Sequence, residues 1–347
     1  MTAPTALAGP APAATARPAG RPRLARWLLR LHRPALYVWA AAVVLVGAEL
    51  LWLGGPLTDA AAQGWQEYDA CGMSPRCSYD QDAILRYKDL YNYLTLAVTA
   101  LPFAVGAWSG AALFGRELET GTARLAWAQG VTPARWLATR LAVPAALVTV
   151  GTGLLVLLHH LAWSAGRGKL DSAKPWHDDL TLHTNGPTTV AVALAGLAVG
   201  ALAGLLWRRT LPALVSALVA TAVVRLLASW ALPHLWPAAT HVTSLRQGPA
   251  GEGIQIADGV VTATGAHVPY PDCGLWELPG CAPAYARLHA TGYYAQTHPY
   301  SHYWPLQITT SLLVLAVAAV CVMAAFRLVG RATGLPLRGR WAEGSAT

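Results

Sequence analysis

Six long apolar stretches constrain this chain more than any other feature of its sequence. A bilayer-spanning helix needs about 20 consecutive apolar residues, and each stretch comes close to or exceeds that length. Charged residues make up 12% of the 347 residues, against about 25% in typical soluble domains. The sequence therefore predicts an all-α, polytopic membrane protein with six transmembrane helices. The stretches are Ala35–Leu53, Tyr93–Leu113, Leu137–Trp163, Thr188–Trp207, Leu211–Leu232 and Trp304–Leu328.

The first stretch shares features with a secretory signal peptide. Basic residues precede it, and Ala60, Ala61 and Ala62 follow it. Its apolar run, however, is longer than the 7–15 residues of a typical signal peptide core, and it contains Glu49. We therefore interpret it as an uncleaved first span.

The basic residues are distributed unevenly between the two sides of the predicted membrane. The segments on the side of the N-terminus hold 16 basic and three acidic residues, and the opposite loops hold eight basic and 13 acidic residues. Cytoplasmic loops of membrane proteins carry an excess of Lys and Arg. We therefore expect both termini in the cytoplasm, with the protein in the bacterial plasma membrane.

This topology divides the chain into four parts. We expect a disordered tail at 1–22, an amphipathic interfacial helix at 23–34, a transmembrane domain at 35–328 and a basic cytoplasmic tail at 329–347. The transmembrane domain has a cytoplasmic elbow at 114–136 and outer loops at 54–92, 164–187 and 233–303. The last of these is a large extracytoplasmic loop between helices 5 and 6, with β-like runs at Ile254–Ile256 and Val260–Thr264.

The cysteines agree with the predicted topology. Cys71, Cys77, Cys273 and Cys281 all fall in outer loops, on the oxidising side of the membrane, and only Cys321 lies in a span. Four cysteines allow three connectivities. The local pairs Cys71–Cys77 and Cys273–Cys281 are the simplest of these.

Two charges and two glycine patterns fall within the predicted spans. Glu49 and Arg225 lie at similar depths and can form an ion pair between the first and fifth spans, or each can reach the outer surface independently. Glycines four residues apart share one helix face and allow close helix packing, either within one subunit or between two. The glycines are Gly106 and Gly110 in the second span and Gly196, Gly200 and Gly204 in the fourth.

No catalytic or nucleotide-binding motif is present in the sequence. A P-loop, H-E-x-x-H, G-x-S-x-G and C-x-x-C are all missing. Eight of the eleven histidines lie in outer loops, where the closest spacing, His298 to His302, is interrupted by Pro299. We therefore expect no enzymatic activity, no metal, no bound cofactor and no nucleic-acid partner.

The cytoplasmic elbow between the second and third spans has defined helix boundaries. Gly130 is suited to end a helix in a left-handed conformation, and Thr132 with Pro133 is suited to begin the next. Glu117 and Glu119 are two of only three acids on an otherwise basic inner surface. We therefore expect the elbow to offer charged and apolar side chains to a cytoplasmic partner.

The elbow resembles the cytosolic segment of ABC-2 type transporter permeases, which has an E-x-G-T sequence, a leucine-bearing helix and a short turn before the third span. The matching residues are Glu119, Gly121, Thr122, Leu125, Thr132, Arg135 and Trp136, with Glu117 beside them; the turn departs slightly and reads V-T-P-A-R. The resemblance implies a permease subunit that works with a separate cytosolic ATPase, which binds the ATP. It also implies a second permease subunit, identical or homologous, with membrane lipid around both. The implied ATPase-coupling residues are Glu117, Glu119, Gly121, Thr122, Arg124, Leu125, Thr132 and Arg135.

Two other functions compete with the permease interpretation. The chain can be a membrane-bound binding or regulatory protein that acts through its outer loops, or an intramembrane enzyme. The second alternative lacks support because the spans contain no evident cluster of His, Asp or Glu. The spans have almost no polar lining, which favours export of a lipid-like, peptide or drug-like cargo over an ion.

Overall fold

The computed structural model describes residues 24–74, 76–249, 251–271 and 278–332, most of which are helical. Six helical segments in this part of the chain are long and apolar enough to cross a membrane, and each contains one of the predicted stretches. The prediction of a mostly helical, multi-pass membrane protein is therefore confirmed. The segments are Arg33–Ala70, Gln81–Glu119, Pro133–Gly166, Pro187–Trp207, Thr210–His234 and Tyr300–Arg331.

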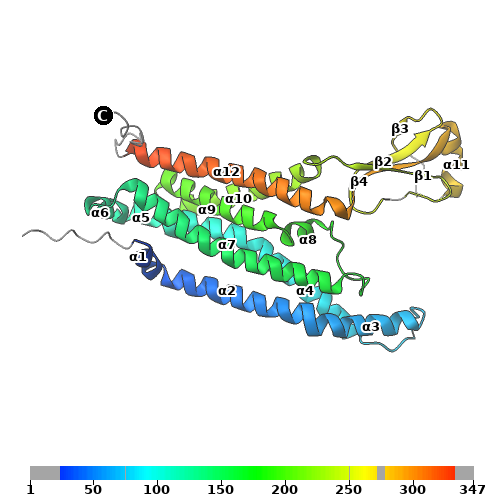
Figure 1. Ribbon diagram of the computed structural model, residues 1–347, viewed down its shortest axis with the longest axis horizontal. Helices are drawn as coiled ribbons and strands as arrows, with labels where there is room; N and C mark the ends of the chain where they lie inside the picture. The colour runs from blue at the N-terminus through cyan, green and yellow to red at the C-terminus, as the bar shows by residue number, and fades with distance from the viewer. Residues whose placement is uncertain (1–23, 75, 250, 272–277, 333–347) are drawn as a thin grey trace, which may run out of the picture.

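The long helices run side by side along the long axis of the molecule (Figure 1). We call one end of this bundle the arginine end; it carries α1 (Leu24–Leu31), α5 (Arg116–Glu119) and α6 (Thr122–Ala128). The other, which we call the sheet end, carries α3 (Thr58–Ala70) and a small β-sheet. The long helices are α2 (Arg33–Trp52), α4 (Gln81–Trp108), α7 (Pro133–Gly166), α9 (Pro187–Trp207), α10 (Thr210–Ala231) and α12 (Tyr303–Ala332).

Helix α9 lies at the centre of the bundle and contacts α4, α7, α10 and α12. Its glycines make these contacts close. A Cβ placed on Gly200 would lie 2.5 Å from the carbonyl oxygen of Gly106, and one on Gly204 would lie 2.5 Å from the Cβ of Phe114. A Cβ on Gly110 would lie 2.8 Å from the carbonyl oxygen of Ala213 in α10. The predicted glycine faces, Gly196 included, thus pack helices within one subunit.

The segment 54–92, predicted to be an outer loop, is mostly helical. Helix α2 continues through the π-helical segment η1 (Leu53–Leu57) into α3, and α4 already begins at Gln81. The side chain of Asp80 caps α4 by accepting a hydrogen bond from the amide of Ala83. Ala61 and Ala62 of α3 are buried where α3 packs against α4. One apolar face is enough for this packing, so both helices continue beyond the fully apolar stretches.

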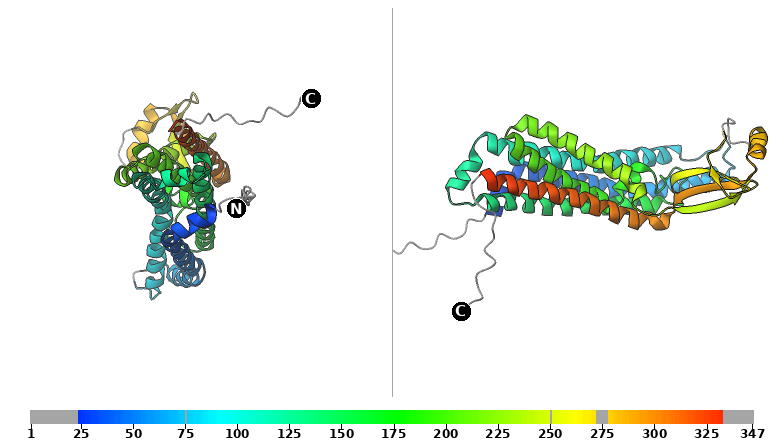
Figure 2. Two further views of the ribbon diagram at one scale, coloured as in Figure 1. Left: turned by 90° about the vertical axis from the view of Figure 1, so that its left-hand side faces the viewer. Right: turned by 90° about the horizontal axis from the view of Figure 1, so that it is seen from above.

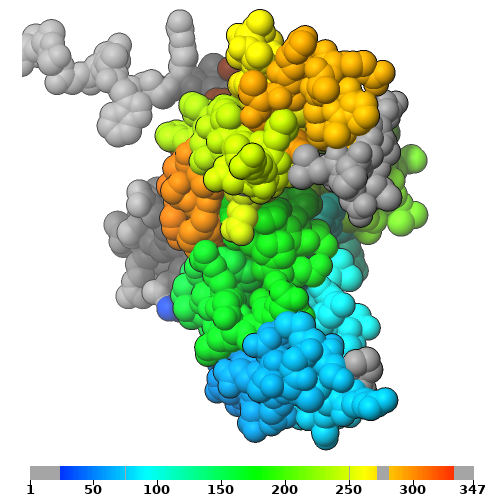
Figure 3. Space-filling view, turned by 90° about the vertical axis from the view of Figure 1, so that its right-hand side faces the viewer, coloured from blue at the N-terminus to red at the C-terminus, as the bar shows by residue number. Residues whose placement is uncertain are grey.

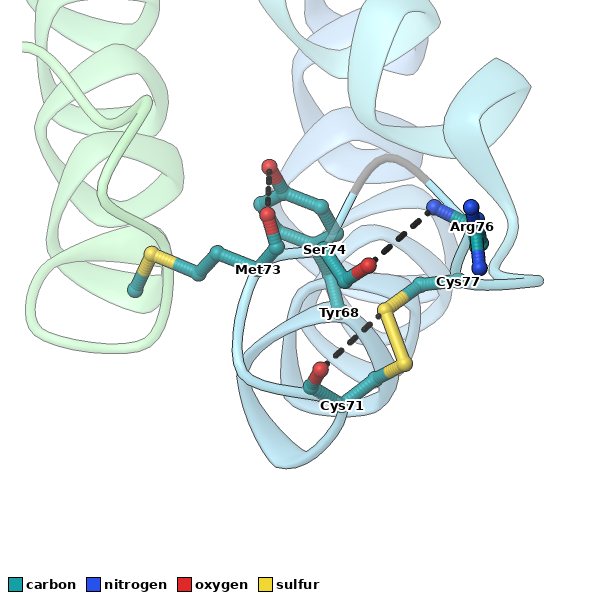
Figure 4. Close-up of a disulfide and its surroundings, with 6 residues drawn as sticks. All are labelled: Tyr68, Cys71, Met73, Ser74, Arg76 and Cys77. Atoms are coloured by element: carbon teal, nitrogen blue, oxygen red, sulfur yellow. Dashed lines mark hydrogen bonds between the residues drawn. A yellow bond between two sulfur atoms is a disulfide. The ribbon is translucent and has the colours of Figure 1, made fainter.

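The turn of this helical hairpin carries the disulfide between Cys71 and Cys77, with the two Cα atoms 6.0 Å apart (Figure 4). Tyr68 in the last turns of α3 donates a hydrogen bond to the carbonyl of Met73, 3.1 Å away. The predicted pairing of Cys71 with Cys77 is therefore confirmed. Cys273 lies outside the described residues, so its predicted pairing with Cys281 stays a prediction; Cys321 is a free thiol.

A four-stranded antiparallel sheet occupies much of the segment 233–303, so the all-α prediction has to be corrected there. The strand order is β1-β4-β2-β3, and Val260, Tyr285 and Tyr293 form a small core between the sheet and α11. β-branched and aromatic residues favour strands in these runs. The elements are β1 (Ala239–Ser244), β2 (Ile254–Thr262), β3 (His267–Val268), α11 (Leu278–Arg287) and β4 (Ala290–His298), flanked by the short helices η3 (Leu232–His234) and η4 (Tyr300–His302).

The sheet extends beyond the ends of the long helices (Figure 2). Viewed from the sheet end, the sheet lies on one side of the molecule and the α3–α4 hairpin on the other (Figure 3). His298 ties the last strand to the bundle: its Nε2 is 2.9 Å from the carbonyl oxygen of Pro233, and its Nδ1 is 3.1 Å from Nδ1 of His302. The described residues contain no group of three His, Cys, Asp or Glu side chains that could hold a metal ion, so this histidine pair has no third metal ligand beside it.

The predicted outer loop 164–187 folds back into the bundle. Its short helix α8 (Asp179–Thr184) has a buried side formed by Thr181, Leu182 and His183. Thr181 bonds to Tyr91 of α4 at 3.1 Å, and Thr184 bonds to Thr99 at 3.0 Å. Helix α8 therefore fills the sheet end of the bundle between α4 and α9.

Buried polar side chains gather around α8, and sequence analysis missed this polar cluster. His159 of α7 lies between Thr95, at 2.8 Å, and Asn185, at 2.5 Å. Gln307 of α12 donates to the carbonyl of Leu182. The prediction that the spans have almost no polar lining is wrong at the sheet end, because a loop residue such as Asn185 supplies partners that the spans lack.

Arg225 belongs to the same region, and the structure corrects its predicted partner. Its guanidinium Nη2 is 3.6 Å from a carboxylate oxygen of Asp179 in α8, and it also bonds to Ser229. Glu49 is exposed and forms no ion pair within the described part of the chain. A carboxylate brought in by a folded-back loop has replaced the expected partner on another span.

Candidate functional site: the elbow between α4 and α7

A π-helical segment, η2 (Ser109–Gly115), continues α4 and leads into the elbow. Ser109 donates a hydrogen bond to the carbonyl of Leu197 in α9 at 2.9 Å. A Cβ on Gly115 would lie 3.2 Å from the carbonyl oxygen of Arg209, in the turn between α9 and α10. Single-turn π-helical segments occur frequently at functional sites. The start of the elbow is therefore fixed against α9 and α10.

A break at Thr120 and Gly121 divides the elbow into the short helices α5 and α6. Gly121 has φ of 77°, in the left-handed region that glycine adopts without strain. The hydroxyls of Thr120 and Thr122 donate to the carbonyls of Arg116, at 2.9 Å, and Glu117, at 3.2 Å. The sequence pattern predicted the first helix end at Gly130 and not this break, which the Thr-Gly-Thr sequence could have revealed.

The second boundary of the elbow follows the prediction. Gly130 has φ of 86°, as expected for a left-handed helix end. The Thr132 side chain accepts a hydrogen bond from the amide of Arg135 at 3.3 Å, and Pro133 is the first residue of α7. These local signals therefore placed the start of the third span correctly.

Glu117 is paired within the chain, although the sequence predicted a cytoplasmic partner for it. Its side chain is buried and lies 2.5 Å from Nη1 of Arg140 in α7. The same nitrogen of Arg140 donates to the carbonyl of Leu113 at 3.2 Å, and its guanidinium lies 4.8 Å from the ring centroid of Trp136. A buried carboxylate needs such a partner. The pair therefore joins the elbow to the third span.

Glu119 also bonds within the subunit, although its side chain stays exposed. One carboxylate oxygen accepts hydrogen bonds from the amide of Thr210, at 2.9 Å, and from its hydroxyl, at 2.5 Å. Thr210 is the first residue of α10, so this carboxylate caps that helix and complements its positive N-terminal end. Glu119 thus links the elbow to the fifth span.

Aromatic side chains pack between the elbow and α7. Trp136 of α7 makes edge-to-face contacts with Phe114 and Trp127, at centroid distances of 5.7 and 5.6 Å. Ala123 and Val131 are buried in the same cluster. The roles of Trp127 and Arg140 could not be predicted from the sequence, because their partners come from another helix.

The remaining predicted residues lie on the exposed side of the elbow. Leu125 has 60% of its surface exposed, although leucine is normally buried in this kind of helix. We call the exposed set formed by Arg124, Leu125, Ala128, Gln129 and Thr132 the elbow face. Arg116 and Arg135 are exposed on either side of it in the sequence. The elbow face is apolar at Leu125 and basic at its margins, which suits a partner with an acidic rim around an apolar pocket.

Comparison with known protein families agrees with this geometry. A family described as ABC-2 membrane transporter related matches residues 40–232, more than half of the chain. The chain belongs to this family. The region matched to the ABC-2 membrane transporter related family runs from α2 to the end of α10 and includes the whole elbow, whereas the sheet follows it. No curated protein and no solved structure matches the chain.

Proposed function

We propose that the chain is the permease subunit of an ATP-binding-cassette exporter, driven by a separate cytosolic ATPase that binds the ATP. A second permease subunit, identical or homologous, completes the path across the plasma membrane. Family membership supports the permease assignment, because ABC-2 permeases in general work with an ATP-binding subunit. A regulatory role through the sheet is not favoured, because the match covers the elbow and the helices from α2 to α10 and not the sheet.

The arginine end is the cytoplasmic end in this proposal. The described ends of α1 and α12 lie there, as do the elbow and the turn between α9 and α10 (Figure 1). The excess of basic over acidic residues at this end supports the orientation. Its described arginines are Arg26, Arg30, Arg33, Arg116, Arg124, Arg135, Arg140, Arg208, Arg209, Arg327 and Arg331.

The observation that carries the coupling role is the pair of links between the elbow and other spans. The ion pair of Glu117 with Arg140 joins the elbow to α7, and the contact of Glu119 with Thr210 joins it to α10. The elbow is itself continuous with α4 through η2. A partner that moves the elbow face therefore displaces the ends of three spans together. This is what coupling of ATP-driven closure to helix movement requires.

Export of an apolar or amphipathic cargo is the direction we propose. The buried polar side chains of the spans concentrate at the sheet end, around His159 and Gln307, and the middle of the bundle holds isolated ones such as Thr152. A path of this kind offers few groups to replace the hydration shell of an ion.

Reconstitution tests this function. The full chain, placed in lipid vesicles with its cognate ATPase, should raise the rate of ATP hydrolysis above that of the ATPase alone. Single cysteines are placed at Arg331 and Gln255 in a cysteine-free background. In intact cells, impermeant thiol reagents should label the cysteine at position 255 and should not label the one at position 331. No stimulation of hydrolysis, or labelling of position 331 from outside, would contradict the proposal.

A further inference from the structure

A groove with an apolar lining opens between α1, α2, α4 and α7. Its volume is about 340 Å³, within the ~300–1,000 Å³ range of small-molecule pockets. Leu28 of α1, Trp39 of α2, Ala104 and Trp108 of α4 and Val148 of α7 are among the residues that line it. The candidate coupling site does not include this groove.

The position of the groove determines what can enter it. Three of its walls are membrane spans, and the fourth is α1 at the arginine end. A groove whose walls are almost entirely apolar offers little to a polar ligand. A helix with its side chains is about 10–12 Å across, so a helix from a second copy would lie against the mouth of a groove of about 340 Å³ and not fill it. An extended acyl chain is therefore a better occupant than a span from a second copy.

Positive charges accompany the groove where it meets α1. Arg26, Arg30 and Arg33 are exposed, and none forms an ion pair within the described part of the chain. These residues alternate along the helix with Leu28 and Leu29, which line the groove. In an isologous contact between two copies, the arginines of each copy would meet those of the other. An anionic group would satisfy them instead.

His32 adds a polar atom to the groove wall near these arginines. Its Nε2 is buried without a hydrogen-bond partner among the described residues, and its ring lies 5.6 Å from that of Trp108. The same Nε2 is 3.9 Å from a carboxylate oxygen of Glu117. The groove therefore ends beside the ion pair that joins the elbow to α7.

We propose that this groove binds one acyl chain of an anionic phospholipid, whose phosphate lies among Arg26, Arg30 and Arg33. The bound lipid fixes α1 against α4 and α7 and, through His32, supports the position of Glu117. Binding of the lipid does not depend on the proposed transport function.

Photochemical labelling tests the proposal on the full-length protein in lipid nanodiscs. The probes are phosphatidylglycerol and phosphatidylcholine that carry a diazirine in one acyl chain. Mass spectrometry should locate the label on groove residues of α2, α4 and α7, with more label from phosphatidylglycerol. The map from the unmodified protein tests the proposal without any variant. Label spread evenly over the lipid-exposed faces of all spans would overturn it.

Two pairs of variants separate the acyl chain from the headgroup. Ala104→Trp fills the groove and should abolish labelling there, whereas Ala316→Trp, at an exposed alanine of α12, should not. The triple variant Arg26→Gln, Arg30→Gln, Arg33→Gln should lose the preference for phosphatidylglycerol, on the order of fivefold for each arginine. The control is the double variant Arg327→Gln, Arg331→Gln, at two other exposed arginines, and it should keep the preference for phosphatidylglycerol.

A second copy in the groove would contradict the lipid proposal. A cysteine at Val38, which lines the groove, should then cross-link two chains and block labelling by the lipid probe. Equal labelling of the wild type and Ala104→Trp would contradict it as well. Neither result bears on whether the chain stimulates an ATPase, so the two proposals fail separately.

Discussion

Glu117 of the elbow and Arg140 of the third span form a buried ion pair, with Oε1 and Nη1 2.5 Å apart. The two residues are 23 positions apart in the sequence and come from different helices. Their contact turns what resembles a loop between spans into a rigid extension of both. It also means that Glu117, like Glu119 with its bonds to Thr210, has a partner within the chain.

Removal of one member of this pair should destabilise the protein strongly. Arg140→Leu leaves the Glu117 carboxylate buried and uncompensated, which costs about 3–5 kcal/mol. Glu117→Gln keeps a hydrogen-bonding group and should cost less, about 1–3 kcal/mol. The thermal midpoint of the purified protein in detergent measures both. The exposed Arg124→Leu is the matched control. If Arg140→Leu melts like that control, the pair does not hold the elbow.

Gly121 should tolerate a side chain poorly because of its backbone conformation alone. No atom lies within 4 Å of a Cβ added there, but φ is 77°. Alanine in the left-handed region costs about 1–2 kcal/mol. Gly153, in the middle of α7, also has free space and helical φ, so Gly153→Ala should stabilise by up to about 1 kcal/mol. We expect the thermal midpoint to fall for Gly121→Ala and to rise for Gly153→Ala. A decrease for both variants, or for neither, would contradict the strain argument.

The sequence predicted those features of the elbow that depend on neighbouring residues. The left-handed Gly130 and the capping Thr132 are local signals, and both are found where expected. The six spans were predictable for the same reason, since their apolar stretches are contiguous. The partners of Glu117 and Glu119 were not predictable from the sequence, because each pair forms only when separate helices pack together.

Two further differences have the same origin. The sheet forms because strands from 239 to 298 pair at long range, although the β-like runs that belong to β2 were visible in the sequence. The polar cluster forms because α8 folds back between spans and brings Asp179 to Arg225. Hydropathy alone predicts a loop for α8 and for the sheet, because a hydropathy pattern carries no information on the direction that the chain takes after a span.

The disulfides should be found as local pairs. Cys71 and Cys77 are bonded, and we expect Cys273 to pair with Cys281. Non-reducing digestion and mass spectrometry of protein from its own membrane should give both cross-linked peptides. Closing a loop as short as the first stabilises by about 2 kcal/mol, so Cys71→Ser should loosen the α3–α4 turn and leave the spans intact. Peptides that join Cys71 or Cys77 to the sheet segment would contradict this pairing.

His183 should make the stability of the protein fall in mild acid. Burial, with a smaller contribution from the nearby Arg225, lowers the pKa of this side chain in α8 to about 3, although Asp179 lies 3.6 Å from it. The unfolded chain takes up a proton near pH 6.5 and the folded chain does not, so stability is lost as the pH falls from about 6.5 towards 3.

The variant His183→Gln isolates this contribution. Thermal midpoints of the wild type and the variant, measured from pH 7.5 to pH 4.5, should differ in slope, with the wild type losing up to about 1.4 kcal/mol more per pH unit. His241→Gln, at an exposed histidine of β1, is the control and should follow the wild type. Parallel curves for wild type and His183→Gln would show that the histidine is not held neutral.

The elbow face carries the central claim, that this surface receives the movement of an ATPase. Leu125→Asp places a charge on its most apolar point, and Arg124→Glu reverses a charge beside it, without touching the links through Glu117 and Glu119. Because both side chains are exposed, the fold and its thermal midpoint should not change. Leu211→Asp and Arg331→Glu, exposed at the same end but outside the elbow, are matched controls.

The most direct measurement is ATP turnover by the cognate ATPase, reconstituted in lipid with the wild-type chain or with Leu125→Asp plus Arg124→Glu. A disrupted interface contact typically costs 2 kcal/mol or more, so we expect ATPase association and stimulation to fall about 30-fold or further in the double variant and to be unchanged in the controls. Wild-type binding and stimulation by a folded double variant would contradict the assignment of the elbow as the coupling site.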